Sequence, residues 1–378
     1  MFDNSFNTIN VIAFSVFGFF IITQLICHFL FFRKLAFYKP IPLKEHSWLP
    51  VSVIVCARNE KENLEKLIPE ILNQNYPNFE LIIADDGSWD GTSDWLDELK
   101  KNTQNLKVVH LSEEMKRDRK GKKFALTLAI KAASSELILL TDADCTPASN
   151  LWIKHMVEPY HKNSQVEIVI GHSPFIRKKG LLSIMNIMEN SFTATSYLSS
   201  ALNNKSYMGV GRNLSYKKSL FFKIKGFASH HHIAGGDDDL FVQEASNKSN
   251  TDVSIHPDSF VFTHSKSTFL SWFQQKKRHN FIGKYYKSQY KWKLGFFSFS
   301  HAMLWISFLV SLFLPNAWIV SSALMLIYFL IKFPLIYMAF NKLKVKNFAF
   351  LMPVFDFMFL VYNLIFGIAI IFYKQKKW

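Results

Sequence analysis

The chain has 378 residues, 49 % of them hydrophobic and 16 % aromatic, and the apolar residues concentrate at its two ends, which argues against a fully soluble protein. Its 44 basic and 29 acidic residues give a formal net charge of +15, which admits nucleic acid, anionic lipid or phosphorylated small molecules as partners. The sequence has no zinc finger, RNA-binding signature or basic run with interleaved aromatics, so we expect no nucleic-acid partner. The three cysteines share no metal-ligand spacing, which fits a reduced compartment without a disulfide framework.

The first predicted element is a membrane span at residues 9–32, which carries no formal charge and is long enough to cross a bilayer. A cleaved signal peptide is the alternative, but its basic start and small-residue cleavage site are not visible. Arg33, Lys34 and Lys39 follow the span, whereas the first ten residues contain no lysine or arginine. By the positive-inside rule we expect the N-terminus outside and the following segment in the cytoplasm.

Strands and helices alternate in the next part of the chain, where the composition becomes that of a soluble domain. Short apolar runs predict strands at residues 51–56, 79–84, 106–111 and 137–140. Apolar residues at helical spacing predict helices at residues 63–72, 92–99 and 122–133. This alternation is typical of crossover units and predicts an α/β fold with an open parallel sheet. Ligands bind beyond the carboxyl ends of the strands in such sheets, so the residues after each strand are candidates for a site.

Polar clusters follow three of the four predicted strands. They are, in chain order, Arg58, Asn59 and Glu60, then Asp85 and Asp86, then Asp142 and Asp144. Each cluster alone fits a helix N-cap or an Asx turn. Together, four carboxylates at adjacent strand ends would repel one another unless a cation or hydrogen-bond donors compensate them. The Asp-x-Asp spacing suits a hard cation such as Mg²⁺ or Mn²⁺, with positions left for phosphate oxygens and water.

Two glycine-containing segments further along the chain are also candidates. Residues 209–216 include Arg212 and Asn213, and the stretch fits a turn that leads into a strand equally well. Residues 235–239 read Gly-Gly-Asp-Asp-Asp. Just before them, three adjacent histidines at residues 230–232 resemble a metal tract, but adjacent histidines seldom converge on one ion, so we expect a loop there.

The last part of the chain predicts three more spans, at residues 296–314, 317–340 and 348–373. Lys342, Lys344 and Lys346 place the loop between the last two in the cytoplasm. Four spans would leave the basic tail at residues 374–377 outside, against the same rule. Either the tail is an exception or one segment only dips into the interface.

Two charged residues, Lys332 and Asp356, lie inside these predicted spans. An intramembrane charge is a functional candidate by default. Lys332 could simply snorkel toward the cytoplasmic end of its helix, whereas Asp356 is harder to dismiss.

The motifs in their order resemble the family 2 glycosyltransferases of the GT-A fold. The matching motifs are Ala-Arg-Asn-Glu, Asp-Asp-Gly-Ser, Gly-Lys-x-x-Ala-Leu, Asp-x-Asp and Gly-Asp-Asp, over residues 50–286. Each is weak alone, but all five occur in order on matching elements, and flanking membrane segments recur in that family. The resemblance implies a nucleotide-sugar-binding, Rossmann-like domain at residues 44–295, between one span with a linker at residues 1–43 and about three spans at residues 296–378.

The resemblance implies that the donor lies against the first four motifs. The nucleotide would lie by the first motif, and one aspartate of the second would bind the base or ribose. The lysine of the third would lie near the diphosphate or sugar, and the first aspartate of the fourth would contact the ribose or sugar. These donor-binding residues are Arg58, Asn59, Glu60, Asp85, Asp86, Lys122 and Asp142. Asp144 would ligate a divalent metal, Mg²⁺ or Mn²⁺, that bridges the diphosphate.

The fifth motif would supply the general base, for which Asp238 is favoured and Asp237 is the neighbouring alternative. Displacing a nucleoside diphosphate builds negative charge that a divalent cation can absorb. The attacking hydroxyl must lose a proton, which a nearby carboxylate can accept. A base on the face of the sugar opposite the leaving group gives a single displacement with inversion.

On the acceptor side the resemblance implies contacts from Arg212, Asn213, Gln275 and Arg278. The last two belong to a segment similar to the Gln-x-x-Arg-Trp motif of processive polysaccharide synthases. His279 replaces the Trp that would stack on the acceptor sugar, which puts processivity in doubt. The basic run at residues 276–278 fits lipid headgroups equally well.

These features predict an inverting glycosyltransferase at the cytoplasmic face of the cell inner membrane. It would move a sugar from a nucleotide-sugar donor, favoured to be UDP-linked, to a glycan or lipid-linked acceptor, with membrane lipid as a further partner. Two alternatives stay open: a polyprenyl-phosphate sugar transferase, and a membrane protein that binds nucleotide-sugars without catalysis. Asp144 and the Gly-Asp-Asp motif favour an enzyme, because a degenerate domain would be free to lose them.

Overall fold

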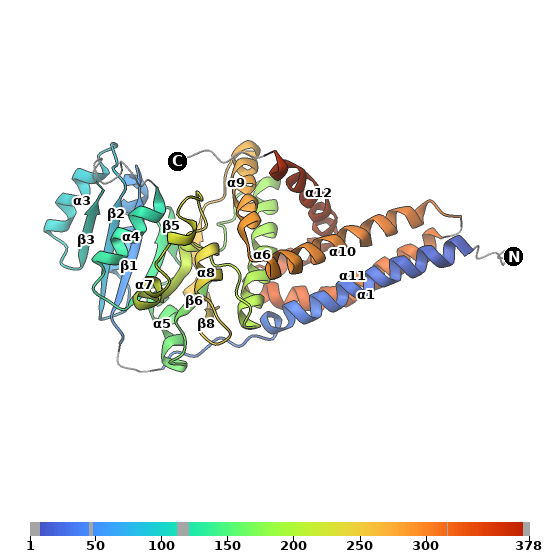
Figure 1. Ribbon diagram of the computed structural model, residues 1–378, viewed down its shortest axis with the longest axis horizontal. Helices are drawn as coiled ribbons and strands as arrows, with labels where there is room; N and C mark the ends of the chain where they lie inside the picture. The colour runs from blue at the N-terminus through green and yellow to red at the C-terminus, as the bar shows by residue number, and fades with distance from the viewer. Residues whose placement is uncertain (1–7, 45–47, 112–120, 316, 373–378) are drawn as a thin grey trace. The chain divides into compact units, whose positions relative to one another are not determined.

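The structure, a computed structural model, describes residues 8–44, 48–111, 121–315 and 317–372 (Figure 1). The chain divides into two compact units. Residues 39–285 form an α/β domain, and residues 8–38 with residues 286–372 form a unit of long apolar helices.

The α/β domain contains a seven-stranded sheet in the order β3-β2-β1-β4-β7-β6-β8. Its strands are β1 (Val51–Ala57), β2 (Phe79–Asp85), β3 (Leu106–His110), β4 (Leu137–Asp142), β6 (Ile168–Gly171), β7 (Leu214–Lys217) and β8 (Thr251–Ser254). A two-stranded sheet pairs β5 (Cys145–Pro147) with β9 (Val261–Thr263). The α-helices are α2 (Lys61–Leu72), α3 (Thr92–Lys101), α4 (Lys122–Ala132), α5 (Trp152–Lys162), α6 (Leu181–Leu202), α7 (Lys218–Lys223), α8 (Asp239–Ala245) and α9 (Phe269–Ile282).

The first four strands and three helices of this domain lie where the sequence predicted them, with ends that differ by one or two residues. β1, β2 and β4 are almost wholly buried, as unbroken apolar runs require in a sheet covered on both faces. The helix α2 buries Leu64, Leu67, Ile68 and Ile71, which recur at the helical period and pack into the core beneath the sheet.

The predicted open parallel sheet is correct only for the first half. β1 to β4 are parallel to one another, but β7 runs antiparallel to both β4 and β6. β7 directly follows the short 3₁₀ turn η1 (Gly211–Asn213), so the glycine-rich stretch does lead into a strand. β6 and β7 have four residues each, too few to show a strand period in the sequence, which is why the mixed pairing was missed.

The strand register brings the polar clusters to one edge of the sheet. Cys56 of β1 is paired in register with Asp142 of β4, and Ala57 with Asp85 of β2. Parallel strands end at the same edge, so the residues after β1, β2 and β4 are neighbours there. Candidate residues distant in the sequence therefore share one edge.

The second unit consists of α1 (Thr8–Ala36), α10 (Ser288–Leu312), α11 (Trp318–Lys342), the 3₁₀ turn η5 (Lys346–Leu351) and α12 (Met352–Ile371). Among the described residues, four helical segments are long and apolar enough to cross a membrane: Thr8–Ala36, Ser288–Leu312, Trp318–Lys342 and Lys346–Ile370. The helix α10 starts before the predicted residue 296, because its polar first turns are continuous with the apolar part. The basic tail at residues 374–377 lies outside the described residues.

Aromatic and aliphatic side chains join the helices of this unit. The helices α1, α10 and α11 run beside one another (Figure 1). Their shared core contains Phe17 and Ile21 of α1, Leu304 of α10, Tyr328 of α11 and Leu360 of α12. The residues that face outward from the same helices are also apolar, as expected for helices surrounded by lipid.

The two intramembrane charges lie together in this unit. Lys332 is 2 % exposed and Asp356 is 4 % exposed, and their side chains form an ion pair. Asp356 Oδ2 also lies 3.0 Å from His301 Nε2 and accepts a hydrogen bond from Trp305 Nε1 at 3.0 Å. Lys332 Nζ donates to the Tyr328 hydroxyl at 3.0 Å. The snorkelling interpretation of Lys332 is therefore wrong, because its ammonium group is buried against a carboxylate.

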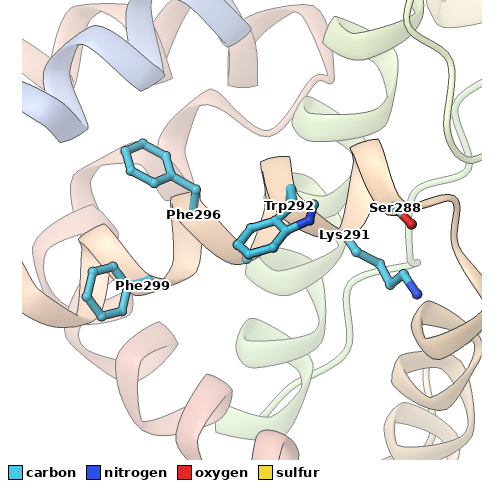
Figure 2. A pocket seen from close by; sticks show the side chains of 6 residues that line it. Ser288, Lys291, Trp292, Phe296 and Phe299 are labelled. Atoms are coloured by element: carbon cyan, nitrogen blue, oxygen red, sulfur yellow. The ribbon is translucent and has the colours of Figure 1, made fainter.

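An open hollow lies on the first half of α10. It is lined by Ser288, Lys291, Trp292, Gly295, Phe296 and Phe299. Figure 2 shows the rings of Trp292, Phe296 and Phe299 projecting from this helix, and all three are more than half exposed. No candidate catalytic residue lines it. Exposed aromatic rings and a lysine near the end of such a helix are typical of the membrane–water interface.

Candidate active site at the carboxyl edge of the sheet

Lys122 connects the end of β4 with the aspartates before α8. It is the first residue of α4, and its Nζ donates to Asp142 Oδ1 at 2.6 Å. The same nitrogen lies 3.5 Å from Asp237 Oδ2. The third, fourth and fifth sequence motifs therefore meet around one ammonium group.

These charges keep one another ionised. Burial alone would lower the pKa of Lys122, but Asp142 and Asp237 hold this pKa well above its ordinary value. Burial alone would raise the pKa of Asp142, but the Lys122 ammonium group lowers it below its ordinary value. The side chains of both residues are about one-third exposed, so solvent reaches the pair.

Asp238 is the N-cap residue of α8, and two backbone amides fix its carboxylate. Gly211 N donates to its Oδ2 at 2.9 Å, and Asp239 N donates to its Oδ1 at 2.8 Å. Burial, followed by the charge of Asp237, raises the pKa of Asp238 above its ordinary value, although these hydrogen bonds oppose the shift. A carboxylate with a raised pKa is a stronger proton acceptor, which is the property a general base needs.

Two glycines lie close to these aspartates, and one of them has a backbone conformation that requires glycine. Gly236 has φ +75°, and a Cβ there would come within 2.8 Å of Leu240 Cδ1. Gly211 faces the carboxylates directly, since a Cβ at this position would lie 3.6 Å from Asp238 Oδ2. A side chain at position 236 would therefore clash with Leu240, whereas a Cβ at position 211 would make an ordinary contact with the aspartates.

Asp142, Asp144 and Cys145 form one of two groups of described residues whose ligand atoms lie within 4.8 Å of one another. The carboxylate oxygens of Asp142 and Asp144 suit a hard divalent cation. Burial raises the pKa of the Cys145 thiol to about 12, so it stays protonated and is a poor ligand for such an ion. Asp144 is exposed, so an ion held there would be open to further oxygen ligands from a bound phosphate. The residues present therefore fit Mg²⁺ or Mn²⁺.

Of the two aspartates after β2, Asp85 forms hydrogen bonds within the domain. It is 1 % exposed and accepts hydrogen bonds from the amide and hydroxyl of Ser88 and from the hydroxyl of Ser93. His110 Nδ1 lies 3.1 Å from its second oxygen. Burial alone would raise the pKa of Asp85, but these partners lower it. Asp85 thus stabilises the loop after β2, next to Asp86.

The cluster after β1 packs on the same loop. Asn59 has φ 57°, and its side-chain oxygen accepts a hydrogen bond from Trp89 N at 2.9 Å. The guanidinium of Arg58 lies over the Trp89 ring at 5.2 Å from the centroid. Glu60 is the N-cap residue of α2 and accepts from Asn63 Nδ2 at 2.5 Å. Arg58, Asn59 and Glu60 therefore border the edge of the sheet between β1 and β2.

Arg212 and Asn213 are neighbours with different surroundings. Arg212 Nε donates to Ser173 Oγ at 2.6 Å, and its guanidinium lies over the ring of Phe175. Asn213 is fully buried, accepts from Trp152 Nε1 at 3.1 Å and donates to two backbone carbonyls. The Asn213 side chain thus serves the fold, and we do not carry it forward as an acceptor contact.

The basic run on α9 does not form one lipid-facing patch. Lys276 is 6 % exposed and forms an ion pair with Glu189 of α6. Its neighbour Arg278 is exposed, and Gln275 is half-buried. The interpretation of Lys276 as a lipid-headgroup ligand is therefore wrong, because the helical period turns it into the domain.

The end of α9 lies against the glycines that precede the aspartates. A Cβ at Gly235 would lie 3.5 Å from Ile282 Cδ1, and one at Gly236 would lie 3.5 Å from Ile282 Cγ2. The helix that carries Gln275 and Arg278 therefore ends against the loop that leads to Asp237 and Asp238.

The histidine tract does not form a metal-capable group among the described residues. His230 is buried, with Nδ1 3.5 Å from Glu244 Oε2, whereas His231 and His232 are exposed. The second metal-capable group, His155, His256 and Asp258, was missed because His155 lies about one hundred residues before the other two. Its imidazole rings are stacked at 3.9 Å, a geometry that keeps their in-plane lone pairs from converging on one ion.

Comparison with known proteins identifies the class of this domain. Residues 52–224 match the family model "Glycosyl transferase family 2". The chain is 29 % identical over 164 residues to poly-beta-1,6-N-acetyl-D-glucosamine synthase from Staphylococcus epidermidis, which covers 43 % of this chain and 38 % of that protein. It is 34 % identical over 145 residues to beta-monoglucosyldiacylglycerol synthase from Nostoc sp., covering 38 % of this chain and 28 % of that protein. These alignments span well under half of either relative.

A solved structure has the same fold. Mannosyltransferase PcManGT from Pyrobaculum calidifontis, in complex with GDP-Man and Mn²⁺, superposes with a TM-score of 0.56 at 17 % identity, over 88 % of this chain and 99 % of that chain. The α/β unit thus has the GT-A fold, with a mixed sheet. The chain therefore contains a domain that matches glycosyltransferase family 2.

Proposed function

We propose that the protein is an inverting glycosyltransferase of a cell inner membrane. It transfers a sugar from a nucleotide-sugar donor, most favourably UDP-linked, to a glycan or lipid-linked acceptor at the cytoplasmic face. The single observation that carries this proposal is the contact of Lys122 with both Asp142 and Asp237 at the carboxyl edge of the sheet. It brings the donor-side and base-side motifs of the family together at one ammonium group.

On the donor side, the cluster after β1 and Asp86 would contact the nucleotide. Asp86 is preferred over Asp85, because the oxygens of Asp85 already accept bonds from Ser88 and Ser93. Lys122 would lie near the diphosphate or sugar, and its pairing with Asp142 would keep both groups charged before the donor binds.

Asp144, with Asp142 beside it, would hold the divalent metal. When bound, such a metal supplies positive charge that stabilises the leaving diphosphate. Asp144 is exposed, so donor phosphate oxygens would have access to its ion.

Asp238 would accept the proton of the attacking hydroxyl. The amides of Gly211 and Asp239 orient its carboxylate, and the raised pKa favours proton transfer to it. Asp237 contacts Lys122 and is more directly tied to the donor side, which supports Asp238 as the base. A single base of this kind gives one displacement and inversion at the sugar.

Arg212, Gln275 and Arg278 would form the acceptor side. Arg212 is held rigidly by Ser173 and Phe175, and α9 packs on the glycines before the base. The four candidate membrane helices support an acceptor that is made or used at a membrane.

The experiment is release of nucleoside diphosphate by the purified full-length protein in lipid nanodiscs. A panel of UDP-, GDP- and other nucleotide-sugars is tested with and without Mn²⁺ or Mg²⁺, with glycan and lipid acceptors added in turn. We expect metal-dependent release with one donor class, stimulated by one acceptor class. Stimulation by polyprenyl phosphate alone would favour the polyprenyl-phosphate sugar transferase. Donor binding without release under every condition would favour the non-catalytic binder.

A further inference from the structure

The first turn of α4 carries two consecutive lysines, and the site described above uses only the first. The second, Lys123, directs its ammonium group to the backbone between α7 and α8. Its Nζ donates to the carbonyl oxygens of His230 at 2.7 Å and Ile233 at 3.0 Å. These two carbonyls belong to residues 230–238, which we call the base loop because the loop ends at Asp238.

The base loop needs such a contact to keep one conformation. Gly235 and Gly236 have φ values of 89° and 75°, and glycine gives the backbone more freedom than any other residue. The loop is anchored at its start by the buried side chains of His230 and Ile233 and at its end by the N-cap of α8. Lys123 attaches the start of the loop to α4, the helix whose first residue contacts the donor-side Asp142.

A lysine suits this task by its chemistry. Its ammonium group has three donors, and a charged donor makes stronger hydrogen bonds to carbonyls than a neutral one. Burial lowers the pKa of Lys123 to about 8, although Asp237 and Asp238 oppose this shift. Lys123 is therefore mostly charged at neutral pH. The positive charge also lies near those two carboxylates, which would otherwise repel each other.

We propose that Lys123 is a positioning residue for sugar transfer, which holds the base loop so that Asp238 stays against Gly211 in the place where a base is needed. This inference rests on the proposed function, since it takes Asp238 as the base. Lys123 acts through the loop, so it controls the rate of transfer and not the affinity for the donor.

The test compares three variants of the full-length protein. Lys123→Met keeps an unbranched side chain of similar length but removes the charge and the donors. We expect kcat to fall on the order of 10–10²-fold, the effect of a displacement of about 1 Å at a catalytic group, with KM for the donor within about twofold of wild type. Lys123→Arg retains charge and donors and should recover most of the rate. Lys131→Met, at an exposed position on the same helix, should behave as wild type.

A second measurement separates this inference from the proposed function. Hydrogen–deuterium exchange of the unliganded protein reports on the base loop without any turnover. Lys123→Met should speed exchange at residues 230–238, whereas Lys131→Met should not. A wild-type protein that transfers no sugar would refute the proposed function. The exchange data would still show whether Lys123 holds the base loop.

Two results would overturn the positioning role. One is unchanged exchange or unchanged kcat in Lys123→Met. The other is a parallel loss of kcat, donor affinity and melting temperature without recovery in Lys123→Arg, which would mean that Lys123 only stabilises the fold.

Discussion

At the scale of single residues, the carboxylates at the edge of the sheet differ in their charged and hydrogen-bonded neighbours, and therefore in pKa. Asp142 is paired with Lys122, so its pKa is held low and it stays ionised. Asp238 is buried beside the like charge of Asp237, so its pKa is raised although two backbone amides donate to its carboxylate. Environments that move the pKa values of two carboxyl groups apart indicate which one is suited to proton transfer.

Asp238→Asn should retain donor and metal binding and lose transfer. The amide is nearly isosteric, but it cannot accept the hydroxyl proton as the carboxylate can. The expected loss in kcat is on the order of 10²–10⁴-fold, the usual contribution of general acid–base catalysis. The measurement is initial-rate kinetics together with donor affinity. Asp237→Asn and Asp239→Asn should lose less, and Asp94→Asn, at an exposed position on α3, should lose nothing.

The pH dependence of kcat/KM is a second test of Asp238 as the base. The base works deprotonated and its pKa is raised above 3.8, so kcat/KM should fall as the pH drops through that raised value. Loss of the Asp237 charge should lower this pKa and shift the acid limb to lower pH. An inactive Asp237→Asn with an active Asp238→Asn would show that Asp237, and not Asp238, is the base. Normal transfer by all three aspartate variants would show that this motif does not contain the base.

Asp144→Ala should abolish metal-dependent donor binding and leave the fold intact. Its carboxylate is exposed and lies beside Asp142, so its removal takes away a metal ligand and no buried contact. Calorimetric titration of the donor with and without Mn²⁺ measures the loss, and an unchanged melting temperature shows that folding is intact. Mn²⁺-dependent activity in this variant would refute the metal assignment.

At the scale of elements, polar contacts connect helices and loops that the apolar pattern leaves unspecified. Lys276 of α9 pairs with Glu189 of α6, and Lys123 of α4 holds the base loop. In the helical unit, Asp356 joins α12 to both α10 and α11. Polar groups of this kind are costly inside a membrane, so their pairing favours one arrangement of the helices.

The buried pair gives an element-scale prediction. Asp356→Leu should be the more harmful single change, because it leaves the Lys332 ammonium and the donors of His301 and Trp305 without their carboxylate. Lys332→Met should cost less, since Asp356 keeps two partners. Breaking a buried ion pair costs about 3–5 kcal/mol, whereas replacing both partners with apolar residues is often neutral.

The double variant Lys332→Met/Asp356→Leu should therefore be more stable than Asp356→Leu alone. Thermal unfolding in detergent micelles measures the three variants, with Lys342→Met, at the half-buried last position of α11, as the control. Additive losses in the double variant would mean that the two residues act independently.

At the scale of the whole molecule, lysine and arginine asymmetry around the helices predicts the topology. The helix α1 ends with Arg33 and Lys34, and Lys342 ends α11. By the positive-inside rule we expect both groups of charges, and the α/β domain that follows Lys39, on the cytoplasmic side.

A reporter inserted after Lys39 should accordingly report cytoplasm, and one at the N-terminus should report the exterior. The measurement is a paired assay with a fluorescent reporter active in the cytoplasm and a phosphatase active outside it. The same pair fused at the C-terminus decides whether the segment at residues 346–370 crosses the membrane. A cytoplasmic N-terminus would overturn the topology and require a recount of the later spans.

The sequence by itself determined the features that depend on local period and order. The apolar runs predicted β1, β2, β3 and β4, and the long apolar segments predicted the four membrane-helix candidates. The order of the five motifs carries the resemblance to the family, and four of them lie within the residues that match its model. These inferences need only neighbouring residues along the chain.

Only the tertiary structure decided the relations between distant segments. The antiparallel pairing of β7, the burial of Asn213 and the pairing of Lys332 with Asp356 depend on which elements meet. Lys123 carries no signal in its own neighbourhood, since its partners are backbone carbonyls more than one hundred residues away. A carbonyl acceptor is present at every residue, so no side-chain pattern can mark such a contact before the chain has folded.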